Sequence, residues 1–274
     1  DGLDGQDRLS YDIFVKSAKD TLESEQFPGY LMPMNQFNNL AGFAAQLGSG
    51  TNAQPFKTVK DYDNWRARGA KLAPIMDQAI VNMREGMRQG VVQPKALMQK
   101  VLPQFDALIA DQADKTLFWG PIKNMPATFS EADKARITAE YRTMIEQEVM
   151  PAFRRMREFI AKEYLPACRD TAGMGDLPNG QAWYAYNAYQ SMSVRRSPAE
   201  VHQTGLNEVA RIHGEIRKVM QEVGFKGSLH DFFKYVNTDK KFEFASEEAL
   251  LTHYRSIEAL LEPGAELVYG WPSF

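Results

Sequence analysis

The chain has 274 residues, of which 44% are hydrophobic and 24% are charged, and its formal net charge is −3. These values are ordinary for a globular protein with one large or two modest cores. Because no long basic run is present, binding to nucleic acid or to an anionic membrane is not expected. No apolar run approaches the roughly 20 residues of a membrane-spanning helix, so the sequence predicts no transmembrane segment. The chain begins with Asp1 rather than methionine and shows no signal peptide, which favours a processed product or a fragment.

Hydrophobic periodicity predicts helices along most of the chain and gives no convincing strand alternation. The helical pattern is interrupted over residues 30–56 and 117–128, which we expect to be irregular, and residues 190–194 are expected to be extended. The fold class is therefore all-α, an irregular array of about seven substantial helices, some long and kinked, with no substantial sheet. The predicted helices cover residues 7–25, 58–88, 94–110, 130–165, 197–223, 228–236 and 246–261, with a shorter one in the aromatic stretch after residue 180.

Prolines and glycines mark the ends and the bends of these helices. Pro263-Gly264 is expected to end the last one. The sequence thus predicts one helical domain over residues 1–263 and a tail or connection over residues 264–274. A proline inside a helix removes one backbone hydrogen bond and crowds the preceding turn. Bends or breaks are therefore expected at Pro74, Pro103 and Pro151.

The most informative stretch runs from residue 177 to residue 224. Asn179-Gly180 is a turn signal, because both residues tolerate a positive φ. Ser197-Pro198-Ala199-Glu200 combines a capping serine, a proline suited to the first helical position and a glutamate that can reach back to the cap. Gly224 ends the helix that follows. An apolar stripe at helical spacing runs along that helix through Val201, Leu206, Val209, Ile212, Ile216, Val219 and Met220.

Aromatic side chains cluster just before that helix, at Trp183, Tyr184, Tyr186 and Tyr189. Packing in a core is the simpler interpretation, because aromatic side chains bury a large area. The functional interpretation is an aromatic wall at the edge of a cleft, with amide and hydroxyl groups nearby to form hydrogen bonds. The candidate substrate-binding residues are therefore Asn179, Trp183, Tyr184, Gln190 and Ser191.

Metal and catalytic motifs are missing from the sequence. The chain has four histidines, but no His-Glu-x-x-His pair occurs. His202 and His213 share a helix face but stand about 16 Å apart along the axis, too far to bind one ion. Cys168 is the only cysteine, so no intrachain disulfide can form, and its apolar neighbours favour a small core side chain. We therefore predict no catalytic residue, no metal ligand and no cofactor in this chain.

An ordered series of segments resembles the amino-terminal half of a bacterial family of unknown function, DUF885, whose members are similar to gluzincin-type zinc peptidases and are often lipoproteins. The resemblance covers roughly residues 7–263. Where family members carry a His-Thr-Thr-Thr-like run, this chain has Ser191-Met192-Ser193-Val194. The matching segments are Asp7–Asp12, Tyr30–Gln36, Phe56–Tyr62, Arg84–Met87, Gly90–Pro94, Leu177–Gly180 with Trp183-Tyr184, and Ser197–Glu200 leading into His202, Gly205-Leu206, Glu208-Val209 and Ile212.

The resemblance implies that this chain is the helical substrate-cleft half of an extracytoplasmic, periplasmic or lipid-anchored zinc-metallopeptidase-like parent. The family's zinc motif lies in a carboxy-terminal half that is missing here. Zinc and a peptide substrate are thus implied for the parent, whereas this part would be inactive alone. The alternative is a helical module or scaffold that binds peptides or proteins and is not an enzyme.

Overall fold

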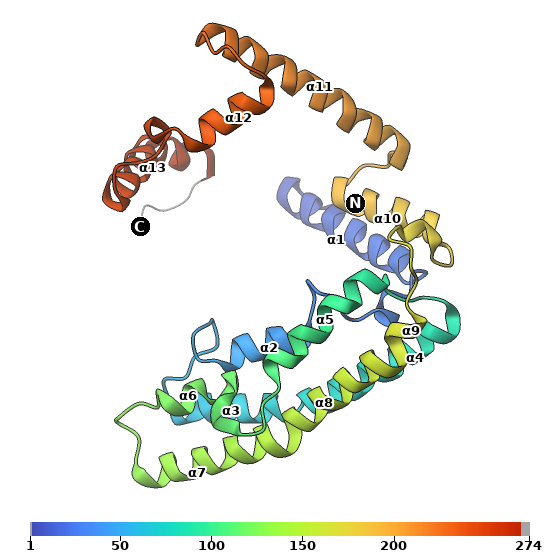
Figure 1. Cartoon of the computed structure of the whole chain (residues 1–274), viewed down its shortest axis with the longest axis vertical. Coiled ribbons are helices and arrows are strands. Elements are labelled where there is room, and N and C mark those ends of the chain that lie inside the picture. Colours follow the sequence, from blue (N-terminus) through green and yellow to red (C-terminus); the bar gives the residue numbers. More distant parts are fainter. Residues whose placement is uncertain (1, 270–274) are drawn as a thin grey trace. The chain divides into compact units, whose positions relative to one another are not determined.

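The chain divides into two compact units, Asp1–Arg196 and Ser197–Phe274, and each is described by itself (Figure 1). The structure is a computed structural model that describes the backbone of residues 2–269 and the side chains of residues 2–261. Every regular element in this part of the chain is helical, so the all-α prediction is confirmed. The division falls at the predicted helix start near Ser197. Residues 264–269, expected to be a tail, belong to the last helix, and residues 270–274 lie outside the described part.

The described part of the first unit contains ten α-helices and four short turns of 3-10 helix. The 3-10 turns are η1 (Gly29–Leu31), η2 (Ala113–Lys115), η3 (Leu117–Trp119) and η6 (Met174–Asp176). The helices are α1 (Gly5–Ser24), α2 (Leu40–Gly48), α3 (Val59–Gly69), α4 (Leu72–Gln89), α5 (Lys95–Leu108), α6 (Gly120–Lys123), α7 (Glu131–Thr143), α8 (Met150–Phe159), α9 (Leu165–Ala167) and α10 (Gly180–Met192).

One uninterrupted helical run extends from residue 131 to residue 167 in the first unit (Figure 1). It consists of α7, α8 and α9, joined by two stretches of wider π-helix, η4 (Met144–Val149) and η5 (Ile160–Tyr164). Each π stretch lies immediately before a proline near the start of the next α-helix, Pro151 and Pro166. A widened turn gives room to a proline ring that would otherwise crowd the preceding turn. The predicted distortion at Pro151 therefore takes the form of a π-helical segment.

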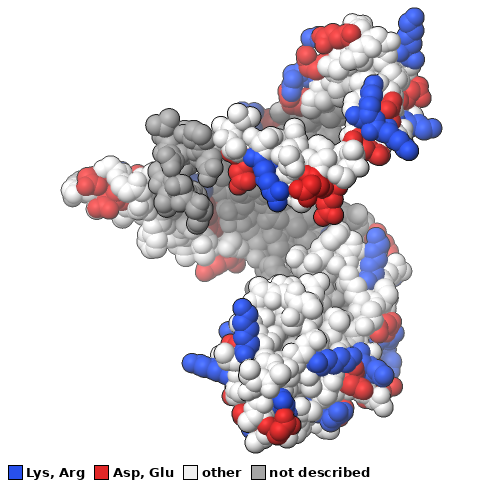
Figure 2. Space-filling view, turned by 90° about the vertical axis from the view of Figure 1, so that its left-hand side faces the viewer, with Lys and Arg blue, Asp and Glu red and all other residues white. Residues whose placement is uncertain are grey.

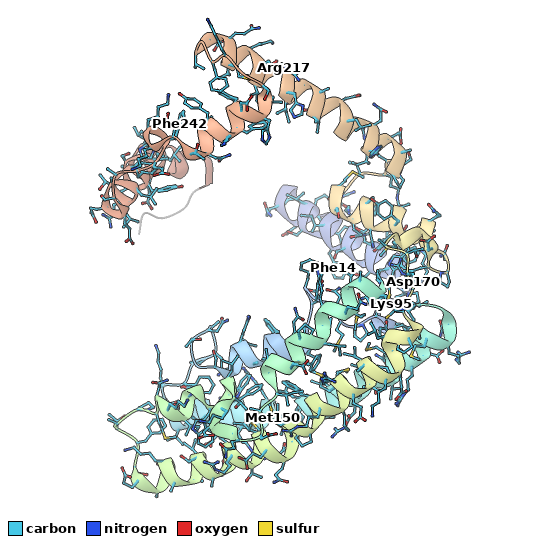
Figure 3. The ribbon with its side chains drawn as sticks, in the orientation of Figure 1. Phe14, Lys95, Met150, Asp170, Arg217 and Phe242 are labelled. Carbon is cyan, nitrogen blue, oxygen red and sulfur yellow. The ribbon has the colours of Figure 1, made fainter. Side chains whose placement is uncertain are left out.

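The buried face of this run makes up much of the main core. Met144, Val149, Phe153, Met156 and Ile160 are all fully buried against residues of α2, α3, α4 and α5. Met150 also lies among the side chains that fill this unit (Figure 3). A smaller second cluster contains Phe27, Leu31, Val91, Leu177, Trp183, Tyr186 and Tyr189.

The predictions of one helix over residues 58–88 and of a bend within it at Pro74 were wrong. The helix expected over residues 58–88 is divided into α3 and α4 near Ala70, and Pro74 lies in the first turn of α4. A proline is tolerated in a first turn because the amide it lacks would have no partner there. Pro103 does not split its helix, since α5 runs through it.

The segment expected to be irregular over residues 30–56 contains α2. Asn39 is the N-cap of this helix, and its side chain accepts a hydrogen bond from the amide of Ala41 at 3.1 Å. The Asn38-Asn39 pair therefore marks a helix start within the segment that was expected to be irregular. Short helices η3 and α6 also lie within residues 117–128, where a connection was expected.

Two further expectations, one for residues 190–194 and one for the end of the last helix, need correction. Residues 190–194 are not extended as a whole, because α10 continues to Met192 and ends at Ser193, which has a φ of 59°. The last helix continues through Pro263-Gly264 to Tyr269. The predicted capping box at Ser197 and Glu200 is confirmed, as is the stop near Gly224, whose φ is 68°.

The second unit consists of α11 (Pro198–Glu222), α12 (Leu229–Thr238), a 3-10 turn η7 (Lys240–Phe242) and α13 (Glu247–Tyr269). Phe225, Phe232 and Tyr235 pack together where α11 meets α12. Most of the apolar stripe of α11 is not buried. Met220 is its single buried residue, whereas Leu206, Val209, Ile212 and Val219 are all exposed.

Lys and Arg side chains alternate with Asp and Glu on the face shown in Figure 2, with broad uncharged areas between them. Within the described residues, no helix is both long and apolar enough to cross a bilayer.

Gly86 should be intolerant of any side chain. A Cβ added there would lie 2.6 Å from the carbonyl oxygen of Val91 and 2.9 Å from that of Leu31. Since both contacts are with backbone, we expect Gly86→Ala to lower the free energy of unfolding by about 1–3 kcal/mol, despite the better helix propensity of alanine. Gly205→Ala in α11 is the matched control, because a Cβ there meets nothing within 4 Å. This control should be neutral or stabilising by about 0.5–1 kcal/mol in urea unfolding, and equal losses would contradict the packing argument.

Candidate functional site

The turn before α10 fixes the position of the candidate substrate-binding residues. Asn179 has the left-handed conformation expected of this turn, with a φ of 55°. Gly180 begins the helix in tight contact with η6, where an added Cβ would lie 2.1 Å from the carbonyl oxygen of Met174. A glycine is therefore required for α10 to begin against this turn.

Trp183 is a core residue. It is buried in the second cluster, and its ring stacks on Phe27 with centroids 5.8 Å apart and an interplanar angle of 16°. Tyr186 and Tyr189 are also buried in this cluster. The core interpretation therefore holds for three of the four aromatic residues.

The other four candidates, Asn179, Tyr184, Gln190 and Ser191, are exposed at the surface. Tyr184 is 51% exposed, whereas its neighbour Trp183 is buried. The Ser191 hydroxyl donates to the backbone oxygen of Asn187 at 3.0 Å, within its own helix. Gln190 lines a pocket of about 430 Å³ with residues of α1, among them Lys16 and Asp20. Since three of the four aromatic residues are buried, Tyr184 is the one that leaves an exposed ring on α10.

A charged and aromatic contact, missed from the sequence, joins α1 to α10. The Tyr189 hydroxyl donates to Asp20 Oδ1 at 2.8 Å, and the Tyr186 hydroxyl donates to the Asp20 backbone oxygen at 2.6 Å. Lys16 Nζ lies 2.6 Å from the other carboxylate oxygen of Asp20. These partners, Lys16 first and then Tyr189, lower the pKa of Asp20 below its usual 3.8. Nearby, the Arg195 guanidinium pairs with Glu23 and lies 4.0 Å from the centre of the Tyr189 ring.

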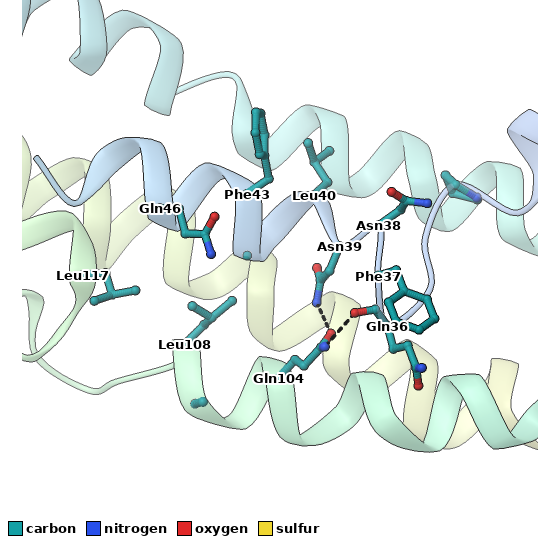
Figure 4. Close-up of a pocket in the computed structure, with 13 residues that line it drawn as sticks. Gln36, Phe37, Asn38, Asn39, Leu40, Phe43, Gln46, Gln104, Leu108 and Leu117 are labelled. Carbon is teal, nitrogen blue, oxygen red and sulfur yellow. Dashed lines mark hydrogen bonds between the residues drawn. The ribbon is translucent and has the colours of Figure 1, made fainter. Parts of the chain in front are cut away.

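A larger pocket between α2 and α5 was also missed. Its volume is about 660 Å³, and its lining includes five carboxamide side chains and no charged residue (Figure 4). The sequence signal was the run Asn35-Gln36-Phe37-Asn38-Asn39, which lies within residues 30–56, a segment expected only to be irregular. The carboxamides belong to Gln36, Asn38, Asn39, Gln46 and Gln104.

The described part of the chain contains no set of side chains that could ligate a metal ion. No group of three His, Cys, Asp or Glu side chains there could hold a metal ion. The described residues alone therefore do not form a zinc site, and the resemblance implies zinc only for the longer parent. Cys168 is buried in the main core, as the sequence predicted, and burial raises the pKa of its thiol to about 11.

A model of the family described as "Bacterial protein of unknown function (DUF885)" matches residues 1–266. The chain belongs to this family. Its fold is also similar to a crystal structure described as a "putative lipoprotein" from Colwellia psychrerythraea, with a TM-score of 0.71 and 20% sequence identity. The similarity covers 81% of this chain and 40% of that one, so this DUF885 chain spans less than half the length of its solved relative. No curated protein matches the chain.

Protonation of Asp20 should loosen α1 from α10 in this DUF885 protein. The pKa of the Asp20 carboxyl is lower in the folded protein than its usual 3.8. The carboxylate therefore contributes its full stabilisation above about pH 3.8, and this stabilisation is lost as the pH falls through the lower folded-state pKa. Asp20→Asn should therefore raise the amide hydrogen exchange of α1 several-fold at neutral pH and make it less sensitive to acid.

Asp12→Asn is the matched control, because Asp12 pairs with Arg8 inside α1 and with no residue of α10. Hydrogen exchange measured by mass spectrometry at neutral pH and in steps below pH 3.8 separates the two variants. Equal exchange in both would show that Asp20 does not hold the helices together.

Proposed function

We propose that this chain is the helical, substrate-contacting half of a longer zinc-metallopeptidase-like bacterial protein. In this proposal it supplies binding surface and no metal ligand, and it has no catalytic activity alone. The zinc ion and the groups that activate water belong to the carboxy-terminal half of the parent. The family membership supports the proposal, and the similarity to gluzincin-type peptidases is what the sequence resemblance implies for this family.

The observation that carries the proposal is the apolar face of α11, which the other helices of the second unit do not bury. Leu206 and Val209 are each 51% exposed, and Ile212, one turn further along the helix, is 45% exposed. Contiguous exposed apolar surface marks a place where another protein surface binds. The solved relative is more than twice as long as the segment it shares with this chain, so a further part of the parent is the natural cover for this face.

The substrate surface in this proposal is the exposed side of α10. Asn179, Tyr184, Gln190 and Ser191 offer amide and hydroxyl groups that can donate to and accept from a peptide main chain. Trp183 supports them from below by packing α10 on the second cluster. The description of the solved relative as a lipoprotein supports an extracytoplasmic, lipid-anchored location for the parent.

A second candidate is a helical module that binds peptides or proteins without catalysis. The pocket between α2 and α5 favours it, because uncharged, amide-lined and partly aromatic surfaces suit peptide binding without reactive groups. In that case the longer protein would bind peptides and not cleave them.

Zinc content and peptidase activity distinguish the two candidates. We expect the longer protein to hold about one zinc ion per chain and to cleave peptides, and this 274-residue chain to do neither. Elemental analysis and a quenched-fluorescence peptide library measure both properties. Stoichiometric zinc and cleavage by this chain alone would contradict the proposal, and a longer protein without either would favour the binding module.

Substitution of Trp183 should mainly affect stability, whereas substitution of Tyr184 should mainly affect peptide turnover. Trp183→Ala should lower the free energy of unfolding by roughly 3–5 kcal/mol, since it leaves a cavity in the second cluster. Tyr184→Ala should change stability by less than about 0.5 kcal/mol, because the side chain is half exposed, and should reduce peptide turnover by the longer protein. Chemical unfolding and turnover by the two variants test this, and unchanged turnover in Tyr184→Ala would remove α10 from the substrate surface.

A further inference from the structure

The pocket between α2 and α5 combines apolar walls with uncharged hydrogen-bonding groups. Leu40, Leu108 and Leu117 line it, and carboxamides are interspersed among them (Figure 4). Its volume of about 660 Å³ lies within the range of sites that hold small ligands or short peptide segments. Since no lysine, arginine, aspartate or glutamate lines it, the pocket provides no counter-ion for a charged ligand.

Two of the five carboxamides build the pocket. Asn39 Nδ2 donates to Gln104 Oε1 at 3.0 Å, and Gln104 Nε2 donates to the backbone oxygen of Gln36 at 2.8 Å (Figure 4). Asn39 also caps α2. These bonds fix the start of α2 against α5, so the pocket is held by groups that are already paired.

The other three carboxamides have no hydrogen-bond partner in the described part of the chain. Those of Asn38 and Gln46 belong to exposed residues, and each offers a donor and an acceptor to a ligand. Gln36 differs because its Oε1 atom is buried and accepts no hydrogen bond. A buried acceptor without a donor is unfavourable. Rotation of this side chain toward a ligand N–H would remove that cost.

Two phenylalanine rings stand exposed on the pocket lining. Phe37 is 81% exposed and Phe43 is 59% exposed, and they lie on either side of the Asn39 cap. On protein surfaces, exposed aromatic rings bind the side chains of a partner, and unpaired amides beside them bind its backbone.

We propose that this pocket binds an extended peptide segment with uncharged, apolar side chains. A peptide backbone presents donors and acceptors in alternation, which matches the paired donor and acceptor of each free carboxamide. A glycan also offers both, but the leucine and phenylalanine walls favour aliphatic or aromatic side chains over hydroxyl-bearing rings. A polyproline segment lacks the N–H that Gln36 needs.

The proposal does not depend on zinc chemistry or on the α10 surface. If peptides are cleaved by the longer protein but do not bind this pocket, the inference is wrong and the proposed function stands. If peptides bind here and the longer protein has no peptidase activity, the inference stands and the binding-module alternative is favoured.

Fluorescence anisotropy of a dye-labelled capped peptide with alternating leucine and alanine, titrated with the 274-residue chain, tests the proposal. We expect saturable binding, and Phe43→Ala should weaken it by about tenfold or more. Phe14→Ala is the matched control, since Phe14 is 70% exposed on α1 of the same unit and does not line the pocket (Figure 3). It should leave the affinity unchanged.

The Gln36→Leu variant tests whether Gln36 contributes to peptide binding or to the stability of the fold. Removal of the buried unpaired oxygen should leave the melting temperature unchanged or raised, while peptide affinity falls several-fold. Three results would overturn the proposal: no binding of the leucine–alanine peptide, equal binding by Phe43→Ala, or tighter binding of an acidic peptide of equal length or of an N-acetylglucosamine oligomer.

Discussion

The first unit depends on one apolar helix face that continues without a break past two prolines. Between residues 131 and 167 the chain buries a nearly continuous row of methionine, phenylalanine and branched side chains. A proline in a regular α-helix would kink or end this row. The π-helical segments η4 and η5 precede Pro151 and Pro166 and let the run continue. The surrounding helices then pack on a single long surface.

Ion pairs along this run position its neighbours but are secondary to the core. Arg155 pairs with Asp77 of α4, and Arg157 pairs with Asp106 of α5. Lys95 and Asp170 form a looser pair at 3.5 Å near the end of the run (Figure 3). All these side chains are well exposed, and exposed pairs contribute about 0–1 kcal/mol each. Burial in the main core therefore holds the unit together.

Both candidate binding surfaces lie at the margins of the buried clusters. The α10 surface is the outer side of a helix whose inner side packs on the second cluster. The pocket between α2 and α5 lies beside the main core, where Leu40 and Leu108 are partly buried against it. Each surface thus has rigid support beneath side chains that remain free to meet a ligand.

The sequence predicted the fold class because periodicity and caps such as Ser197 are local signals. It misplaced α2 and the division of α3 from α4, since Asn39 and Pro74 can each mark either a break or a helix start. The Asp20–Tyr189 contact and the paired Asn39 and Gln104 join segments far apart in the chain, so no local pattern could show them. The aromatic cluster could be seen in the sequence. Only the packing of the folded chain shows that Trp183 is buried and that Tyr184 is exposed.

The exposed apolar face of α11 links the fold to the proposed function, in which another part of a longer parent covers this surface. Hydroxyl-radical footprinting of Leu206, Val209 and Ile212, in this chain and in the longer protein, measures that cover directly. If the proposal is correct, oxidation of these side chains is several-fold lower in the longer protein. Equal oxidation in both would contradict it.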